Sequence, residues 1–89
     1  MPFEYDRAKS AANKAKHGID FEEAQKLWDD GKALVLPVAT HSEPRFMFVG
    51  RIGQKFWTAV ITDREGNTRI ISVRRARDNE IEDYLSRGV

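Results

Sequence analysis

The sequence predicts an α+β domain with an antiparallel sheet, two helices before its main strands and one helix after them. Helix-capping residues and helix-favouring runs occur near both ends of the chain. Between them lie four strand-like runs, divided by short turn signals, most of which contain glycine. With 89 residues and no cysteine, the chain is one small domain without disulfides. We therefore expect a single domain over 1–89, with the order β-α-α-β-β-β-β-α and the helices packed against one face of the sheet.

The N-terminal elements are bounded by capping residues. Asp6 stands at an N-cap position, and Gly18 supplies a C′ residue that tolerates positive φ. Asp20 and Glu23 form a pair that resembles a capping box and opens a second helix. The second helix has apolar residues at helical spacing, which predict a buried stripe of Phe21, Ala24, Leu27 and Trp28. The expected elements are a strand over 2–5, a helix over 7–16 and a helix over 21–29.

The rest of the chain is predicted to form an antiparallel meander and a last helix. Pro37, near the end of one apolar run, is compatible with an edge strand. Gly53 with Gln54, and the segment 65–67, predict two hairpins. Asp78 is the expected cap of the last helix, whose apolar side is Ile81, Tyr84 and Leu85. The expected strands are 33–38, 45–52, 55–63 and 68–75, and the helix runs over 78–85.

Basic charge is concentrated in one part of the sequence. Residues 51–77 carry seven positive and two negative side chains, a balance of +5, although the whole chain has a net charge of only +1. The densest part is 69–77, where strand alternation would place Arg69 and Arg75 on one side and Arg74 on the other. Arginine binds phosphate oxygens through its planar fork of donors. This segregation favours a nucleic-acid or phosphate partner, with a solvated sheet face as the alternative.

Composition excludes several classes of site. Without cysteine there is no thiol nucleophile or zinc–thiolate centre, and His17 and His41 are too few for a typical metal cage. We therefore expect no metal site and no cofactor. The N-terminus lacks an apolar signal region, and no apolar run approaches the length of a membrane span, so a cytoplasmic location is expected.

Ordered sequence blocks cover nearly the whole chain and carry a family resemblance. They are Asn13–Ala24, Glu43–Arg45, Gly50–Gly53, Arg69–Ala76, then Glu80 and Tyr84. In this order the blocks resemble the BrnT toxins of bacterial type II toxin-antitoxin systems. Those toxins commonly have a tryptophan where this chain has Tyr5, so an aromatic residue is kept.

The resemblance implies both a fold and a set of partners. It implies a RelE-like fold and a metal-independent ribonuclease that halts translation. It also implies neutralisation by a BrnA antitoxin, a ribbon-helix-helix protein through which the complex binds operator DNA and represses its own operon. Tyr84 is similar to an aromatic residue that RelE-like toxins place near the C-terminus for stacking or proton transfer, although its spacing also suits core packing.

Metal-free RNA cleavage needs a base for the attacking 2′-hydroxyl, a stabiliser of charge on the phosphorane and an acid for the leaving 5′-oxygen. We expect Arg45, Arg64 and Arg74 to converge as a phosphate clamp. His17 is a candidate proton carrier, or else a helix-end residue that pairs with the terminal carbonyls of the helix. Glu43 is a candidate base, or else orients Arg45.

Other basic residues are expected to contact the RNA backbone: Lys14, Lys16, Arg51, Arg69 and Arg75. The alternative for Arg51 and Arg75 is pairing with Glu43, Asp63 or Glu80. Met47, Val49 and Trp57 are the candidate partner-binding residues, or else core residues. The alternative function is a non-catalytic domain that binds nucleic acid or only an antitoxin, as a co-repressor, because contact with phosphates needs charge but no proton transfer.

Overall fold

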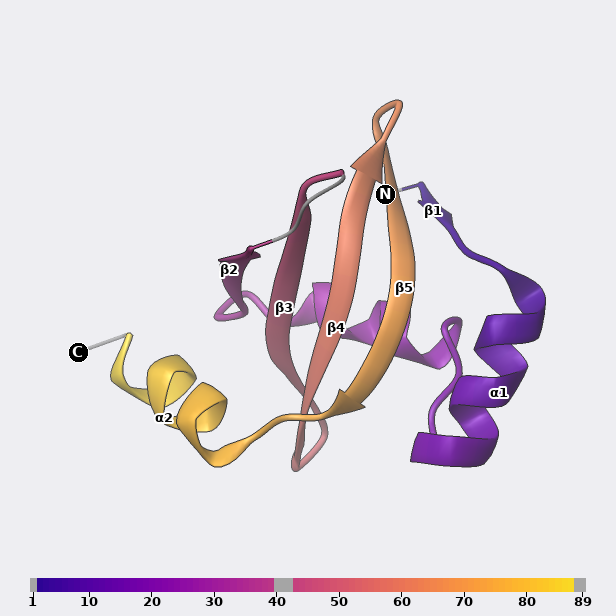
Figure 1. Ribbon diagram of the computed structural model, residues 1–89. Coiled ribbons are helices and arrows are strands. Elements are labelled where there is room, and N and C mark those ends of the chain that lie inside the picture. The colour runs from indigo at the N-terminus through magenta and orange to yellow at the C-terminus, as the bar shows by residue number, and fades with distance from the viewer. Residues whose placement is uncertain (1, 40–42, 88–89) are drawn as a thin grey trace.

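A computed structural model describes residues 2–39 and 43–87, so His41 lies outside the described residues. The described part forms one sheet with the strand order β1-β5-β4-β3-β2 and three helices (Figure 1). This confirms the predicted α+β class. The elements are β1 (Phe3–Glu4), α1 (Arg7–His17), the 3-10 helix η1 (Glu23–Asp29), β2 (Leu34–Val38), β3 (Arg45–Ile52), β4 (Lys55–Arg64), β5 (Asn67–Arg75) and α2 (Asp78–Ser86).

The sheet is mixed, so the prediction of a purely antiparallel sheet was wrong at β1. Strands β2 to β5 are antiparallel to their neighbours, whereas β1 pairs in parallel with β5. No hairpin links β1 to β5, so the direction of this pair was free of the turn constraint that fixes the other strands. Both predicted hairpins form; in the second, Glu65 and Gly66 both have positive φ, as a two-residue type I′ turn requires.

Helix α1 begins and ends at the predicted caps. The Lys9 backbone N–H donates to the Asp6 carboxylate at 3.0 Å, and Gly18 ends the helix in the left-handed region at φ 82°. The side chain of Asn13 fixes the helix to the sheet. Its amide donates to the backbone carbonyls of Ile19 and Val73, and its oxygen accepts the Val73 N–H.

The second predicted helix is a 3-10 helix and begins at Glu23, so both its type and its start differ from the prediction. The predicted pair that resembles a capping box is nevertheless present, because the Glu23 N–H donates to the Asp20 carboxylate at 2.7 Å and the Asp20 N–H donates to the Glu23 carboxylate at 3.0 Å. The Ser10 hydroxyl accepts the Phe21 N–H in the same segment. Phe21, Ala24 and Leu27 are spaced by three and are all buried. Within η1, the spacing of Ala24 and Leu27 matches the three residues per turn of a 3-10 helix, and Phe21 joins them in the core from the turn before it.

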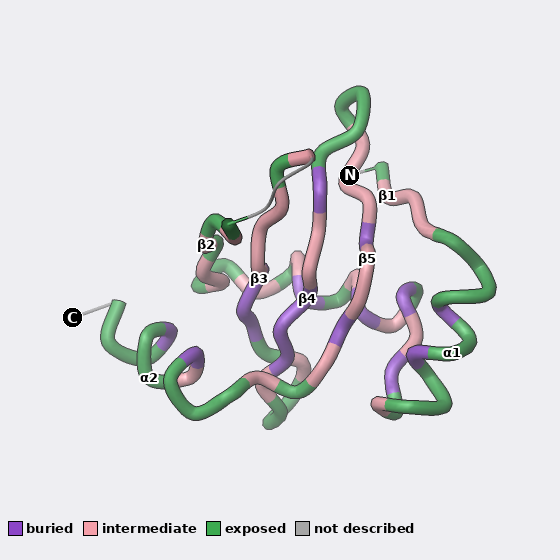
Figure 2. The backbone as a smooth tube through the Cα atoms, viewed as in Figure 1, coloured by how far each residue is buried: buried purple, intermediate pink, exposed green. Residues whose placement is uncertain are grey.

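The two faces of the sheet differ in what covers them. On the covered face, Phe48, Ala59 and Val73 pack with η1 and Ile19 to form the core. The opposite face carries Met47, Val60 and Ser72 at paired positions, and we call it the open face. Figure 2 shows buried segments in β3, β4 and β5, while β2 and the tip of the β4–β5 hairpin are less buried.

A β-bulge changes which arginines share a face. Val60 pairs with Ser72 and Ile61 pairs with Ile70, so Ile71 is an extra residue in β5. Beyond the bulge, Arg69 lies opposite Thr62, on the same face as Arg74 opposite Thr58. The prediction that Arg69 shares a side with Arg75 was therefore wrong. The bulge brings Arg69 to the open face and leaves Arg75 on the covered face.

Helix α2 also departs from the prediction in three respects. Arg77, not Asp78, occupies the N-cap position, and its N–H donates to the Glu80 carboxylate at 2.8 Å. Leu85 is 59% exposed rather than buried. The Glu80 side chain reaches Thr58 and Arg74 on the open face, so α2 lies on the side of the sheet opposite η1. The helices are therefore not all on one face.

Candidate functional site

The three arginines of the predicted clamp lie at two ends of the open face. Arg45 begins β3 and Arg64 ends β4; we call this the Arg45 end. Arg74 lies two strands away, opposite Thr58, which in turn lies opposite Val49. Val49 is four residues along β3 from Arg45, roughly 13 Å at the usual rise per strand residue. The structure therefore brings Arg45 and Arg64 to one end and leaves Arg74 at the other, which we call the Arg74 end.

Arg74 is held by a buried carboxylate. Its two terminal nitrogens donate to the two oxygens of Glu80 at 2.8 and 2.9 Å, and Nη2 lies 3.9 Å from the sulfur of Met47. Glu80 is 3% exposed, and it also accepts from the Thr58 hydroxyl at 2.9 Å. This fork-to-fork pair satisfies the guanidinium within the protein. Arg74 therefore joins α2 to the sheet.

The same contacts set the ionisation of Glu80. Hydrogen bonds from Arg74 lower the pKa of Glu80 to about 2, against the opposing effect of burial. The Arg77 N–H and the Thr58 hydroxyl lower this pKa further. The partner shift is in the expected direction, because the hydrogen bond to Glu80 raises the pKa of Arg74. Both groups are therefore charged across the physiological pH range.

The surroundings of Arg45 differ from those of Arg74. Its Nε atom is buried, yet it has no hydrogen-bond partner among the described residues. A buried N–H donor without a partner is costly and is uncommon in native structures. Arg64, Arg69 and Arg74 each pair with a glutamate, whereas no carboxylate partner of Arg45 is found in the described part of the chain. Arg45 therefore has a buried donor that remains for a ligand.

Glu43 lies beside Arg45 at the same end of the sheet. Its carboxylate accepts from Arg64 at 3.3 Å, and both side chains of this pair are more than one-third exposed. The Pro44 carbonyl accepts from the buried Thr62 hydroxyl at 2.6 Å, which ties this segment to β4. Of the predicted catalytic residues, the structure thus brings together Arg45, Arg64 and Glu43.

Tyr84 has a partner inside the protein. Its hydroxyl donates to Asp30 at 2.8 Å, its ring meets Phe56 edge-on at 5.2 Å, and the residue is buried. Burial and the contact with Asp30 both raise the pKa of Tyr84. Burial also raises the pKa of Asp30, but hydrogen bonds to its carboxylate outweigh this effect and leave its pKa lowered. These contacts support the core-packing alternative for Tyr84.

The other predicted RNA contacts are dispersed. Arg51 lies over the Phe56 ring at 5.2 Å and Arg75 over the Trp57 ring at 5.3 Å, so aromatic contacts replace the carboxylate pairing considered for them. Arg69 pairs with Glu4 at 2.9 Å and borders the open face. Lys14 pairs with Glu23, and Lys16 is exposed on the same helix. His17 ends α1, which runs beside β5 away from the Arg45 end (Figure 1).

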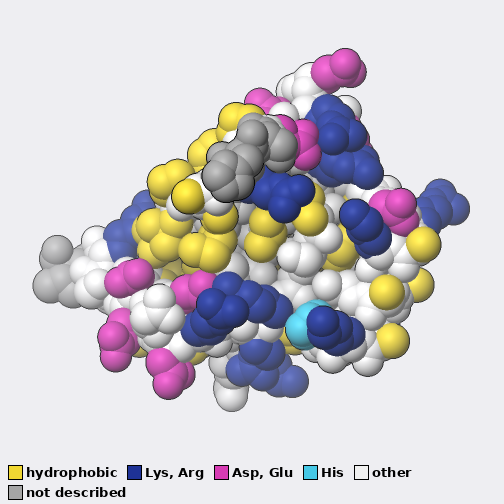
Figure 3. Space-filling view, viewed as in Figure 1, with side chains coloured by type: hydrophobic (Ala, Val, Ile, Leu, Met, Phe, Trp, Pro, Cys, Tyr) yellow, Lys and Arg dark blue, Asp and Glu magenta, His cyan; other side chains and the backbone are white. Residues whose placement is uncertain are grey.

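Partly exposed apolar residues lie between the two ends of the open face: Leu36, Met47 and Val60 share this side by register and are only partly buried. Figure 3 shows apolar side chains over β2 and β3, bordered by lysine and arginine. Two of the predicted partner-binding residues do not belong to this surface. Val49 is fully buried, and Trp57 belongs to the core cluster of the covered face.

The family to which the chain belongs bears on the function of this surface. Residues 5–80 match the family described as the ribonuclease toxin, BrnT, of type II toxin-antitoxin systems. The chain belongs to this family. The match spans most of the chain, so the predicted BrnT family is confirmed; it includes Arg45, Arg74 and Glu80, whereas Tyr84 lies beyond it. A comparison with curated proteins gave no match.

Two further findings bear on the BrnT family member. Over residues 2–39 and 43–87, no three His, Cys, Asp or Glu side chains gather as a metal site would require. No helix in the same residues is long and apolar enough to cross a membrane.

Asp30 and Thr58 were not among the predicted site residues, and Glu80 was predicted only as a possible partner of Arg51 or Arg75, apart from its place in the family resemblance. Glu80 is the third residue of the helix that follows Arg77, a position from which a carboxylate often reaches back to the helix start. That pattern could have predicted that the Glu80 carboxylate contacts the start of α2. Asp30 and Thr58 act across long sequence separations, and no local pattern marks them.

Proposed function

We propose that this BrnT family member is a metal-independent endoribonuclease that binds single-stranded RNA on the open face and cleaves it at the Arg45 end. The unpartnered buried Nε of Arg45 carries this proposal. A phosphate oxygen would supply the missing acceptor, and the guanidinium would stabilise negative charge as it develops on the oxygens of the phosphorane. Apolar Met47 and Val60 lie next along the face, where they can contact bases while arginines hold the backbone.

The reaction follows from the residues gathered at this end. The 2′-oxygen attacks the adjacent phosphorus, and its proton passes to Glu43. The bond from phosphorus to the 5′-oxygen breaks, and this oxygen takes a proton from water. The products are a 2′,3′-cyclic phosphate and a 5′-hydroxyl. Arg64 orients Glu43 through their ion pair at 3.3 Å. Arg74 positions α2 beside the face, and the catalytic roles predicted for His17 and Tyr84 are not used.

The toxin would act with a protein partner, as its family does. The proposal includes a RelE-like mode of action that inhibits translation in the cytoplasm. It also includes neutralisation by a BrnA-type ribbon-helix-helix antitoxin, through which the complex binds operator DNA and represses its operon. We further propose that residues 1–89 act as one domain, because the described strands share one sheet and one core. Exposed apolar residues beside the arginines suit a protein partner as well as RNA.

RNA cleavage by the purified chain tests the proposal directly. Labelled single-stranded RNA should be cut in the presence of EDTA and should yield cyclic phosphate ends. A matched RNA with 2′-deoxyribose at the cleavage position should remain intact, since the nucleophile is removed. Expression without an antitoxin should arrest growth. Cleavage that needs an added divalent cation, or that cuts the deoxy-substituted RNA, would contradict the mechanism.

A second candidate function is binding of RNA or antitoxin without cleavage. It is favoured by the ion pairs of Arg64, Arg69 and Arg74, because these arginines already have carboxylate partners. RNA that is shifted in a gel but stays intact, together with unaffected growth, would support this alternative.

A further inference from the structure

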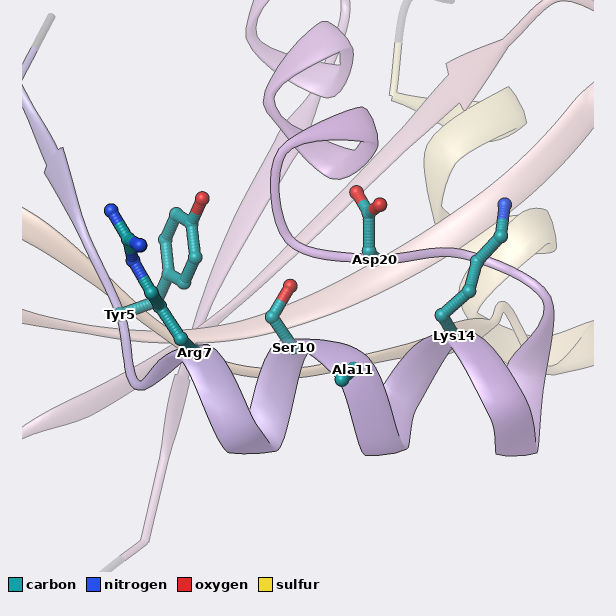
Figure 4. Close-up of a pocket in the computed structure, with 6 residues that line it drawn as sticks. All are labelled: Tyr5, Arg7, Ser10, Ala11, Lys14 and Asp20. Atoms are coloured by element: carbon teal, nitrogen blue, oxygen red, sulfur yellow. The ribbon is translucent and has the colours of Figure 1, made fainter.

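A cleft beyond the β1 edge of the sheet carries polar side chains that the proposed reaction does not use. It measures about 440 Å³ and lies between α1 and the segment that leads into η1. Figure 4 shows side chains rising from the start of α1 and from the facing segment into the same space, above a floor formed by the helix. The lining residues are Tyr5, Arg7, Ser10, Ala11, Lys14 and Asp20.

Three polar groups in the cleft have no hydrogen-bond or ion-pair partner in the described part of the chain. They are the Tyr5 hydroxyl, the Arg7 guanidinium and one oxygen of Asp20. The other Asp20 oxygen accepts the Glu23 N–H at 2.7 Å, which fixes the orientation of the carboxylate. The remaining polar groups are engaged, because the Ser10 hydroxyl accepts from Phe21 and Lys14 pairs with Glu23.

The aromatic wall of the cleft is held by the core. The Tyr5 ring meets the Phe21 ring edge-on, with centroids 5.7 Å apart at 89°, and Phe21 is 1% exposed. Tyr5 itself remains partly exposed. The cleft therefore combines an anchored aromatic ring, an oriented carboxylate acceptor and an unpaired guanidinium. Single-stranded RNA is recognised by this set of groups: stacking on a ring, hydrogen bonds to the pairing edge of a base, and charge beside a phosphate.

We propose that the cleft binds one unpaired base of the RNA substrate and selects a base with N–H donors on its pairing edge, guanine foremost; this rests on the proposed function. Guanine presents two adjacent donors, N1–H and the 2-amino group, to an acceptor such as Asp20. Uracil presents one N–H between two carbonyl oxygens, which the carboxylate repels. Arg7 would hold the neighbouring phosphate. The cleft is therefore a specificity site separate from the Arg45 end.

The cleft and the open face are continuous along the chain. Tyr5 directly follows Glu4, whose carboxylate pairs with Arg69 on the open face at 2.9 Å. Strand β1 is the edge strand of the sheet and has only two residues. One RNA strand can therefore cross from the arginines of the face to Tyr5 and Arg7.

The substitution Asp20→Asn tests the selection of the base. Asparagine keeps an oxygen that can accept the Glu23 N–H, while its NH₂ group replaces the free carboxylate oxygen as a donor. Cleavage sites in a random-sequence single-stranded RNA are mapped for both proteins. The wild type should prefer guanine at one fixed position relative to the cut, and Asp20→Asn should lower that preference about tenfold.

A matched pair of variants tests the phosphate contact. Arg7→Gln should weaken binding of a short 2′-O-methyl RNA about tenfold at low salt, whereas Lys9→Gln, on the same helix outside the cleft, should change it less than twofold. Unchanged base preference in Asp20→Asn, or equal effects of Arg7→Gln and Lys9→Gln, would overturn the inference even if RNA is still cut. The inference would also be overturned if these variants bound an antitoxin more weakly but kept the base preference and RNA affinity of the wild type. A wild type that cuts no RNA would instead refute the proposed function.

Discussion

The Arg45 end and the Arg74 end of the open face hold the same type of side chain in opposite states. Arg74 has both terminal nitrogens on Glu80, and this carboxylate is itself satisfied by Thr58 and the Arg77 N–H. Arg45 has a buried Nε with no partner among the described residues. Arginine content alone therefore does not locate a phosphate site. An arginine saturated by protein acceptors stabilises the fold, and one with an unmet donor is available to a ligand.

The largest effect on stability is expected at the Arg74 end. Glu80→Gln removes the charge that Arg74 faces and should lower the free energy of unfolding by about 3 kcal/mol, because the guanidinium remains partly buried without its counterion. Urea unfolding measures this loss. The matched control is Glu82→Gln, an exposed position on the same helix, which should change stability by less than about 0.5 kcal/mol. If Glu80→Gln and Glu82→Gln are equally stable, the Arg74–Glu80 pair does not stabilise the fold, and the Arg74 end does not differ from the Arg45 end in this respect.

The pH dependence of stability should report the same pair. The pKa of Glu80 is about 2 in the folded protein, below its ordinary value of 4.5. The stabilisation is therefore present above pH 4.5 and is lost as the pH falls toward 2, by on the order of 2 kcal/mol at pH 3. Comparing urea unfolding at pH 7 and pH 3 isolates this contribution, since Glu80→Gln should lack it. An equal pH dependence in wild type and variant would show that Glu80 does not carry the effect.

A smaller effect is expected where α2 meets Asp30. Tyr84→Phe keeps the ring beside Phe56 and removes the hydrogen bond to Asp30, so the loss should be about 1 kcal/mol. RNA cleavage should stay within about twofold of wild type once the protein is folded. If cleavage instead falls a hundredfold while the urea midpoint is unchanged, Tyr84 is a proton carrier and the Arg45 end is not the whole site.

The smallest effect on stability is expected for the exposed ion pair at the Arg45 end. Arg64→Gln should change the free energy of unfolding by less than about 0.5 kcal/mol, because both side chains of the Arg64–Glu43 pair are well exposed. It should nevertheless slow RNA cleavage, since Arg64 orients Glu43. A loss of stability as large as that of Glu80→Gln would make the two ends alike.

Local signals predicted much of the fold, and contacts distant in sequence explain what they missed. The caps at Asp6 and Gly18 could be predicted because the chemistry of a helix end lies within a few residues. The parallel pairing of β1 and the bulge at Ile71 could not, since each depends on how a strand meets a distant partner. The bulge also reversed the face predicted for Arg69.

The candidate site was predictable only in part for a similar reason. Residue type and strand alternation placed Arg45 on the face opposite Phe46 and Phe48, as observed. Whether an arginine is free depends on which carboxylate reaches it. The packing of α2 brings Glu80 to Arg74, and the sequence shows no such packing before the chain folds.

The most direct test compares Arg45→Met with Arg74→Met by measuring RNA cleavage and urea unfolding on the same preparations. Arg45→Met should cut RNA at least a hundredfold more slowly while its free energy of unfolding stays within about 1 kcal/mol of wild type. Arg74→Met should be less stable by about 3 kcal/mol, and its folded fraction should retain most of the cleavage activity. Cleavage at the wild-type rate by Arg45→Met would contradict the assignment of the Arg45 end as the site of RNA cleavage.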